Sequence, residues 1–141
     1  IGATLNASAQ LVPVNTFKTV ISQVKKIKAG ESVGYTGKNK VDRDTEVAVV
    51  PVGYADGYPR SLSNGKGKML VSGRLAPILG NVCMDMVMLD VTGLGAREGD
   101  EVIVFGRQLP VQEVALWANT IPYELLAAVS SRVKRVYVQG M

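Results

Sequence analysis

Histidine is absent from the 141 residues, and cysteine occurs only once. Without histidine the chain lacks the commonest metal ligand and the one side chain that titrates near neutral pH without help. A single cysteine forbids both an internal disulfide and a metal site built from clustered cysteines. These shortages exclude a histidine-containing catalytic triad and a zinc site of either kind, so we expect no metal centre.

Long apolar runs are also missing. No stretch approaches the ~18 apolar residues that a membrane span needs. The first ten residues, IGATLNASAQ, have neither the basic region nor the apolar core of a signal peptide. With 47% hydrophobic and 20% charged residues, the composition is that of an ordinary soluble domain. We therefore expect no membrane partner, and an unpartnered thiol suits the cytoplasm.

The net charge of +4 comes from 16 basic residues interspersed with 12 acidic ones. This mixture forms no continuous basic patch of the kind that binds nucleic acid, so we expect no nucleic-acid partner. A small basic β-barrel that grips single-stranded nucleic acid through Tyr54, Tyr58 and the lysines stays a minor alternative.

Fifteen glycines separate short apolar runs, and this punctuation favours strands. We predict one domain, residues 1–141, with a mainly β, antiparallel barrel or Greek-key-like fold. Two short helices are expected near the C-terminus, beginning at Pro110 and at Thr120 as N-cap, with Pro122 in the first turn of the second. Strands are predicted over residues 17–27, 45–54, 68–71, 75–79, 82–91, 101–105 and 132–138.

The predicted strand over residues 82–91 has one wholly apolar face, which is expected to lie in the core. Asp85, on the opposite face, needs a hydrogen-bonding or charged partner. Cys83 has no histidine to activate it and is expected to be an inert core residue. The apolar face consists of Val82, Met84, Met86 and Met88.

Two of the five tyrosines lie in one octapeptide, GYADGYPR, residues 53–60. A tight turn at the end of a buried strand would hold Tyr54 and Tyr58 rigidly. Asp56 would accept hydrogen bonds there, and Arg60 would supply a positive charge. Such rigid polar groups can form a site, but the pattern alone favours the simpler arrangement in which both rings cap the core.

Two other tyrosines stand where chemistry is possible. A phenol acts as a base only where positive charge or hydrogen-bond donors stabilise the phenolate, and Lys38 and Lys40 follow Tyr35 closely. Tyr123 lies at the predicted start of a helix, where an anion such as phosphate is favoured. Either tyrosine could instead be an ordinary, partly packed residue.

Five segments, in order, resemble the carboxy-terminal domain of alanine racemases, the pyridoxal-phosphate enzymes that interconvert L- and D-alanine. They are PVNTFKTVISQVKKIKAGESVGY, VPVGYADGYPRSLSNG, APILGNVCMDMVMLDVTG, GDEVIVFG and ANTIPYELLAAVSSRVKRVY. Together they run from about residue 11 to the end. The ending RVKRVY is similar to that of family members fused behind a peptidoglycan Mur ligase, and both a fused and a stand-alone parent stay open.

The resemblance implies roles for individual residues. Tyr35 matches the family's catalytic tyrosine, the base on the face opposite the lysine that carries the cofactor. Inverting a stereocentre requires a proton to leave one face and another to arrive on the other, so two groups are needed. Met84 matches the position whose backbone amide meets the substrate carboxylate, and Tyr123 matches the tyrosine that binds the cofactor phosphate. Positions at or behind the entrance are matched by Tyr54, Arg60 and Asp85.

The resemblance also implies partners. Pyridoxal 5'-phosphate would be held by an amino-terminal TIM barrel, whose lysine motif nothing in the 141 residues resembles, so we expect the chain alone to be inactive. A head-to-tail homodimer and a small amino-acid substrate are implied, with D-alanine going to peptidoglycan. Alanine and serine stay open as substrates, and a purely structural dimerisation domain is a further alternative. Asn81 stands where family members often have arginine.

Overall fold

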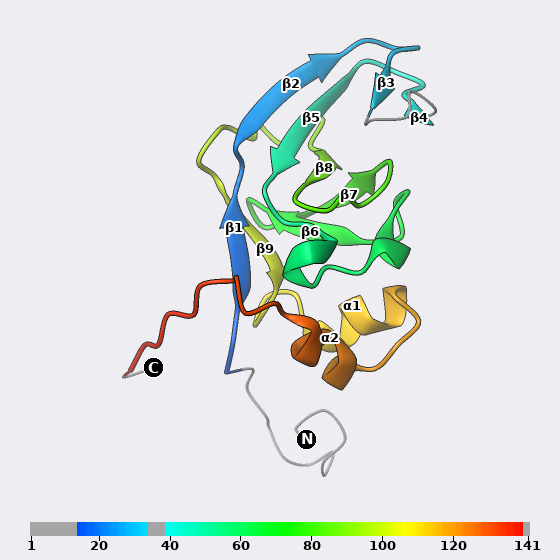
Figure 1. Cartoon of the computed structure of the whole chain (residues 1–141). Coiled ribbons are helices and arrows are strands. Elements are labelled where there is room, and N and C mark those ends of the chain that lie inside the picture. The colour runs from blue at the N-terminus through cyan, green and yellow to red at the C-terminus, as the bar shows by residue number, and fades with distance from the viewer. Residues whose placement is uncertain (1–13, 34–38, 140–141) are drawn as a thin grey trace.

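The computed structural model describes residues 14–33 and 39–139, and Figure 1 shows its elements. A curled antiparallel sheet forms the body, a small hairpin-like pair, β3 (Ser32–Val33) and β4 (Asn39–Lys40), lies at one end, and two helices lie at the other. The sheet contains β1 (Phe17–Val20), β2 (Gln23–Ile27), β5 (Thr45–Val50), β6 (Lys68–Val71), β7 (Arg74–Leu79), β8 (Val87–Asp90) and β9 (Glu101–Phe105). The helical elements are the 3-10 turns η2 (Tyr54–Asp56) and η3 (Arg60–Leu62) and the α-helices α1 (Val111–Trp117) and α2 (Pro122–Ala128).

Strands β1 and β2 are two halves of one bent segment. They stand at opposite ends of the strand order β1-β9-β6-β7-β8-β5-β2, because β1 pairs with β9 and β2 pairs with β5. Between them, the amides of Ile21 and Ser22 donate to the carbonyls of Asp100 and Val49 at 2.9 Å. The first and last strands of the order are therefore continuous, and the sheet curls round as in a barrel. This confirms the strand prediction for residues 17–27, except at Ile21 and Ser22, where the chain bends and the strand divides into two.

Strands β5 to β8 form a Greek key. Strands β6, β7 and β8 follow one another as neighbours, and β5 lies beside β8. This order requires a long connection from β5 to β6. The connection is residues 51–67, and it contains η2, η3 and the octapeptide GYADGYPR. The topology therefore places this motif in a long loop rather than in a tight hairpin.

The predicted hairpin between residues 68–71 and 75–79 is confirmed. Ser72 and Gly73 have φ values of 52° and 75°, as the two central residues of a type I′ turn require. Val71 and Arg74 face each other at the turn, so Arg74 belongs to β7 rather than to the loop.

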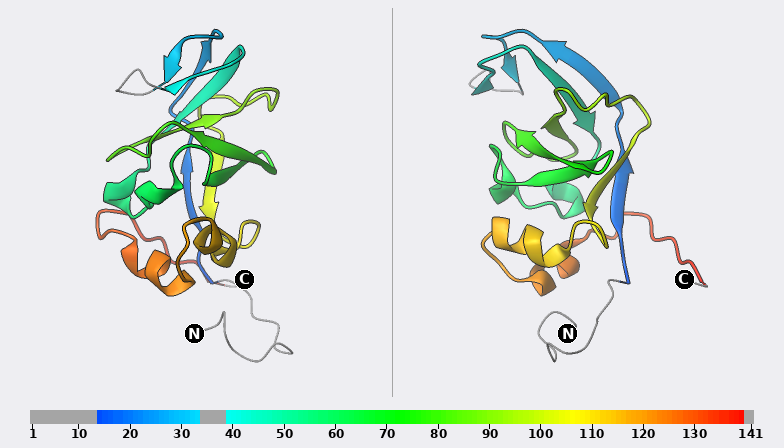
Figure 2. Two further views of the ribbon diagram at one scale, coloured as in Figure 1. Left: turned by 90° about the vertical axis from the view of Figure 1, so that its right-hand side faces the viewer. Right: turned by 180° about the vertical axis from the view of Figure 1, so that it is seen from behind.

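Both predicted helices are present and close one end of the sheet (Figure 2). Pro122 lies in the first turn of α2, as expected, but the helix begins one residue later than predicted, with Ile121 instead of Thr120 as its N-cap. The Thr120 hydroxyl bonds the Glu124 carboxylate at 2.7 Å instead of capping the helix. Helix α1 contributes Val114 and Ala115, and α2 contributes Leu125, to the same apolar core that lines the sheet.

The predicted strand over residues 82–91 is only partly correct. Strand β8 begins at Val87, and the preceding residues form a loop in which the Cys83 amide donates to the Met86 carbonyl at 3.0 Å. Because of this loop, the side chains do not alternate between the two faces of a strand from residue 82 onwards as expected. Val87 and Leu89 are buried, while Met84 is 53% exposed. The prediction that the methionine face lies in the core was wrong, although Val82 is buried. Cys83 is only partly buried.

The predicted strand over residues 132–138 was wrong. Residues 132–139 pair with no strand in the described part of the chain, and Val136, Tyr137 and Val138 are exposed. An apolar-basic alternation becomes a strand only when a neighbour accepts its hydrogen bonds. Figure 2 shows this tail leading away from the body. Within residues 14–33 and 39–139, no helix has the length and apolar character to cross a bilayer.

Candidate functional site

Two loops, residues 53–64 and 80–86, are joined through their backbones and form the candidate site. The amides of Tyr54 and Ala55 donate to the carbonyls of Cys83 and Met84 at 3.0 Å and 2.9 Å. Gly53 makes this approach possible, because a Cβ there would overlap both carbonyls. Its φ of −149° is extended, so close packing, and not backbone conformation, requires glycine.

The turn that follows Gly53 rests on the end of α2. The Asp56 carboxylate accepts a hydrogen bond from the Gly53 amide at 2.8 Å, which confirms its expected role. Gly57 has a φ of 112° and lies so close to Ala128 that a Cβ would stand 2.5 Å from the Ala128 carbonyl. The Ser130 amide also donates to the Asp56 carbonyl at 3.0 Å. The turn is therefore held both from within and by the segment after α2.

The second half of the long loop is anchored as firmly. The Ser63 hydroxyl accepts from the Val82 amide at 2.8 Å and donates to the Arg60 carbonyl at 2.6 Å. The Asn64 amide donates to the Gly80 carbonyl at 2.7 Å, and its side-chain amide reaches Asn81 at 3.4 Å. Arg60 itself lies at the surface, at the start of η3.

Arg132 joins the two loops through its side chain. Its Nε donates to Asp56 at 2.7 Å, and one Nη donates to Asp85 at 2.6 Å. Burial alone would raise the pKa of Asp56, but hydrogen bonds from Arg132 and Gly53 outweigh it and lower the pKa below its usual value. Hydrogen bonds to Asp56 and Asp85 raise the pKa of Arg132. The partner expected for Asp85 is thus present.

Sequence reasoning missed Arg132 because it lies in the basic-apolar tail that was read as a strand. Its partners are 76 and 47 positions away in the chain. No local pattern around Arg132 indicates such pairing. The one signal pointing toward it was the unpaired Asp85 carboxylate, which demanded a cation from elsewhere.

The two tyrosines of GYADGYPR differ in environment. Tyr54 is 44% exposed, whereas Tyr58 is buried in the core. The Tyr58 hydroxyl has no hydrogen-bond partner within the described ranges, and burial raises its pKa. The alternative in which both rings cap the core therefore holds for Tyr58 and fails for Tyr54.

The structure brings Tyr54, Met84 and Asp85 into one hydrogen-bonded assembly. Tyr123 is the second residue of α2 and is 38% exposed, while the opposite end of that helix contacts Gly57. Because α2 has only seven residues, an anion would depend on the Tyr123 hydroxyl rather than on the helix end. Tyr35 lies outside the described residues.

The backbone at Met84 presents an unused donor. The carbonyls of Cys83 and Met84 accept bonds from the neighbouring loop, but the Met84 amide donates to no acceptor among residues 14–33 and 39–139. Because the carbonyls of Cys83 and Met84 are held by hydrogen bonds, the orientation of this N–H is fixed as well.

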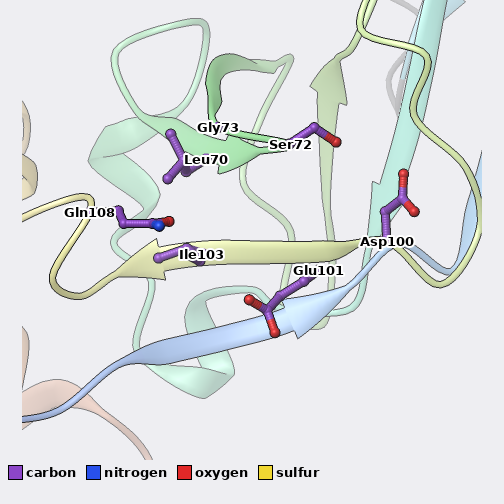
Figure 3. Close-up of a pocket in the computed structure, with 7 residues that line it drawn as sticks. All are labelled: Leu70, Ser72, Gly73, Asp100, Glu101, Ile103 and Gln108. Atoms are coloured by element: carbon purple, nitrogen blue, oxygen red, sulfur yellow. The ribbon is translucent and has the colours of Figure 1, made fainter.

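A depression of about 270 Å³ lies on the strands β6 and β9 (Figure 3). No residue of the two loops lines it. Its two carboxylates point in different directions in Figure 3, and Glu101 is paired with Lys18 at 3.0 Å. The described part of the chain contains no group of three acidic or cysteine side chains that could hold a metal. We therefore place the candidate site at the two loops and not at this depression. The residues that line the depression are Leu70, Ser72, Gly73, Asp100, Glu101, Ile103 and Gln108.

The fold and the loops define a β-domain that carries a polar site on a long Greek-key connection. Residues 14–137 match the family described as alanine racemase, C-terminal domain, and the chain belongs to this family. This confirms the resemblance found in the sequence and the predicted fold class.

Individual relatives agree with the family match. The alanine racemase of Desulforamulus reducens is 48% identical over 130 residues, which are 91% of this chain and 35% of the relative. That of Vibrio cholerae is 47% identical over 127 residues, 89% of this chain and 35% of the relative. The chain thus spans about a third of the length of these relatives.

Solved structures share the fold. The biosynthetic alanine racemase from Pseudomonas aeruginosa superposes with a TM-score of 0.83 at 39% identity, covering 88% of this chain and 35% of that one. Alanine racemase from Bartonella henselae, solved with covalently bound pyridoxal phosphate, gives a TM-score of 0.82 at 36% identity. That match covers 87% of this chain and 34% of the solved one.

Proposed function

We propose that this chain supplies part of the active site of an alanine racemase that interconverts L- and D-alanine with pyridoxal phosphate. Membership of the family supports this function. The observation that carries it is the Met84 backbone, because its N–H is unused while the flanking carbonyls are held by Tyr54 and Ala55. A rigid donor of this kind suits the carboxylate that every amino-acid substrate carries.

The residues of this chain fit a contributing role toward the cofactor. Tyr123 presents a partly exposed phenol, which can donate a hydrogen bond to a phosphate oxygen. Neither loop of the candidate site contains a lysine, and in this proposal the lysine that would hold the cofactor belongs to the amino-terminal barrel. When bound, pyridoxal phosphate withdraws electrons from the substrate and makes its α-proton acidic.

The residues of this chain then divide the remaining work. The Met84 amide orients the substrate by its carboxylate, and the Tyr35 hydroxyl moves a proton at one face of the α-carbon. A barrel residue serves the other face, because a single base would only return the proton where it came from. Tyr54, Arg60 and Asp85 shape the approach to the site.

Two partners complete the site in this proposal. The barrel domain of the parent chain binds the cofactor, and a second subunit in a head-to-tail homodimer brings Tyr35 and Met84 to it. Exposed apolar side chains near the loops and on α2 support an interface at this surface. The exposed apolar side chains at this surface are Tyr54, Met84, Ile121, Tyr123 and Leu126.

In this proposal the enzyme acts in the cytoplasm and supplies D-alanine for peptidoglycan.

Racemisation by the full-length parent enzyme tests the proposal. We expect conversion of L- and D-alanine, measured by chiral chromatography, with serine as the competing substrate. Tyr35→Phe should reduce catalytic efficiency by about 10²–10⁴-fold in both directions, because each direction needs an acid-base group on both faces of the α-carbon. Tyr137→Phe alters a 90% exposed ring and serves as the control. Equal, undiminished rates for Tyr35→Phe would show that Tyr35 is not the base.

A further inference from the structure

We propose that Arg132 is a positioning residue, which holds the turn after Gly53 and the loop of Met84 in the arrangement that presents the Met84 amide to substrate. This inference rests on the proposed function for its catalytic consequence. The clamp itself rests on the contacts of the described residues alone.

The guanidinium of Arg132 contacts one carboxylate from each loop. Nε bonds Asp56 at 2.7 Å, and Nη2 bonds Asp85 at 2.6 Å. A planar guanidinium can direct two N–H groups at once in fixed directions, whereas an ammonium is a single point charge. Without Arg132, two like charges would remain facing the same place and would repel each other. The side chain therefore adds a second link between the two loops, beside their backbone hydrogen bonds.

The backbone around Arg132 is tied to the same turn. The Ser130 amide donates to the Asp56 carbonyl at 3.0 Å, and the Arg132 amide donates to the Ser130 hydroxyl at 3.2 Å. The guanidinium thus acts from a fixed base, although its side chain is 49% exposed. An exposed arginine on a mobile tail would lose more side-chain entropy on forming the same bonds.

Asp85 is the residue through which Arg132 acts on Met84. Its carboxylate is 60% exposed and bonds only to Arg132 in the described part of the chain. Because Asp85 directly follows Met84, fixing its side chain also restrains the peptide that joins them. The bonds from Tyr54 and Ala55 remain when Arg132 is removed. We therefore expect the loop to loosen while the domain stays folded.

The experiment compares Arg132→Gln with Arg43→Gln in the full-length parent enzyme. Arg43 is the matched control, because it is an exposed arginine that bonds a single carboxylate, Asp90, at 3.2 Å away from the two loops. Amide hydrogen exchange of residues 53–57 and 81–86, read by mass spectrometry, reports the clamp directly. Michaelis constants and turnover for both enantiomers of alanine report its consequence.

For Arg132→Gln we expect at least tenfold faster exchange in both segments and unchanged exchange in β6 and β7. KM for alanine should rise about tenfold in both directions, with turnover within threefold of the wild type, since carboxylate binding is weakened and proton transfer is not. Arg43→Gln should change neither quantity. Arg132→Lys keeps the charge but cannot direct two bonds, so its exchange and KM should lie between wild type and Arg132→Gln.

Unchanged exchange in either segment overturns the clamp. Faster exchange with an unchanged KM overturns the positioning role. If Arg132→Gln does not fold, the same two criteria apply to Arg132→Lys. A wild-type enzyme that does not racemise alanine refutes the proposed function instead, and with it the role in substrate binding, while exchange still decides whether Arg132 holds the two loops.

Discussion

Gly53 and Tyr58 show how differently two residues of one short motif are constrained. Gly53 is required by space, because the carbonyls of Cys83 and Met84 occupy the volume of a side chain. Tyr58 fills the core with its ring but brings a hydroxyl that finds no partner in the described residues. A buried polar group without a hydrogen bond is destabilising. The motif therefore contains one residue, Gly53, that no larger residue can replace, and one residue, Tyr58, whose hydroxyl lowers the stability of the fold.

We predict that Tyr58→Phe raises the free energy of unfolding by about 1 kcal/mol, because it removes an unsatisfied buried hydroxyl and keeps the ring. Urea denaturation followed by circular dichroism measures the change. Tyr137→Phe, at a 90% exposed ring, should leave stability unaltered. A destabilised Tyr58→Phe protein would mean that the hydroxyl makes a bond that stabilises the fold.

The long β5–β6 connection carries the first of the two loops that form the candidate site. A Greek key needs a crossing segment, and here the crossing segment carries two 3-10 turns and docks on the loop before β8. Helix α2 supports the connection from the other side through Gly57 and Ala128. The candidate site therefore depends on three elements: the β5–β6 connection, the loop before β8 and the end of α2, which must be held in place.

Arg135 holds that end. Its guanidinium donates to the carbonyls of Val129, Ser130 and Val133 at 3.2, 2.6 and 2.8 Å. We predict that Arg135→Met lowers the free energy of unfolding by about 1 kcal/mol, because these carbonyls lose a charged donor. Thermal unfolding by calorimetry measures the loss. Lys134→Met removes a neighbouring exposed cation and should have no effect; equal losses for the two variants would contradict the capping role.

At the scale of the whole molecule, acid sensitivity follows from two carboxylates. Burial alone would raise the pKa of Asp90, but hydrogen bonds from Thr92 and Arg43 lower it, as Arg132 and Gly53 do for Asp56. A carboxylate whose pKa is lowered in the folded state stabilises the protein. This stabilisation is fully present above the pKa of the unfolded state, ~3.9, and it is lost as the pH falls through the pKa of the folded state.

We therefore predict that the free energy of unfolding is insensitive to these two groups near neutral pH and falls below about pH 4. Asp90→Asn should be less stable than the wild type at pH 7 and should show a shallower decline in acid, because one of the two titrations is gone. Urea denaturation at a series of pH values measures both slopes. Parallel curves for variant and wild type would show that Asp90 does not contribute.

Much of the fold could be predicted from the sequence, because it depends on local chemistry. Valine-rich runs became strands, and the continuous segment of β1 and β2 was expected over residues 17–27. The candidate site was found only in part. Tyr54, Met84 and Asp85 were named and do lie together, but Arg132 was missed and the methionine face was assigned to the core.

The sequence by itself determined the β6–β7 turn at Ser72 and Gly73 and the place of Pro122 in the first turn of α2, since each depends on the conformations that those residues themselves allow. Only the tertiary structure decided that the Met84 loop leaves the sheet and that Arg132 bridges the two loops. Both outcomes depend on hydrogen-bond partners far away in the chain, and the fold has to form before such groups can meet.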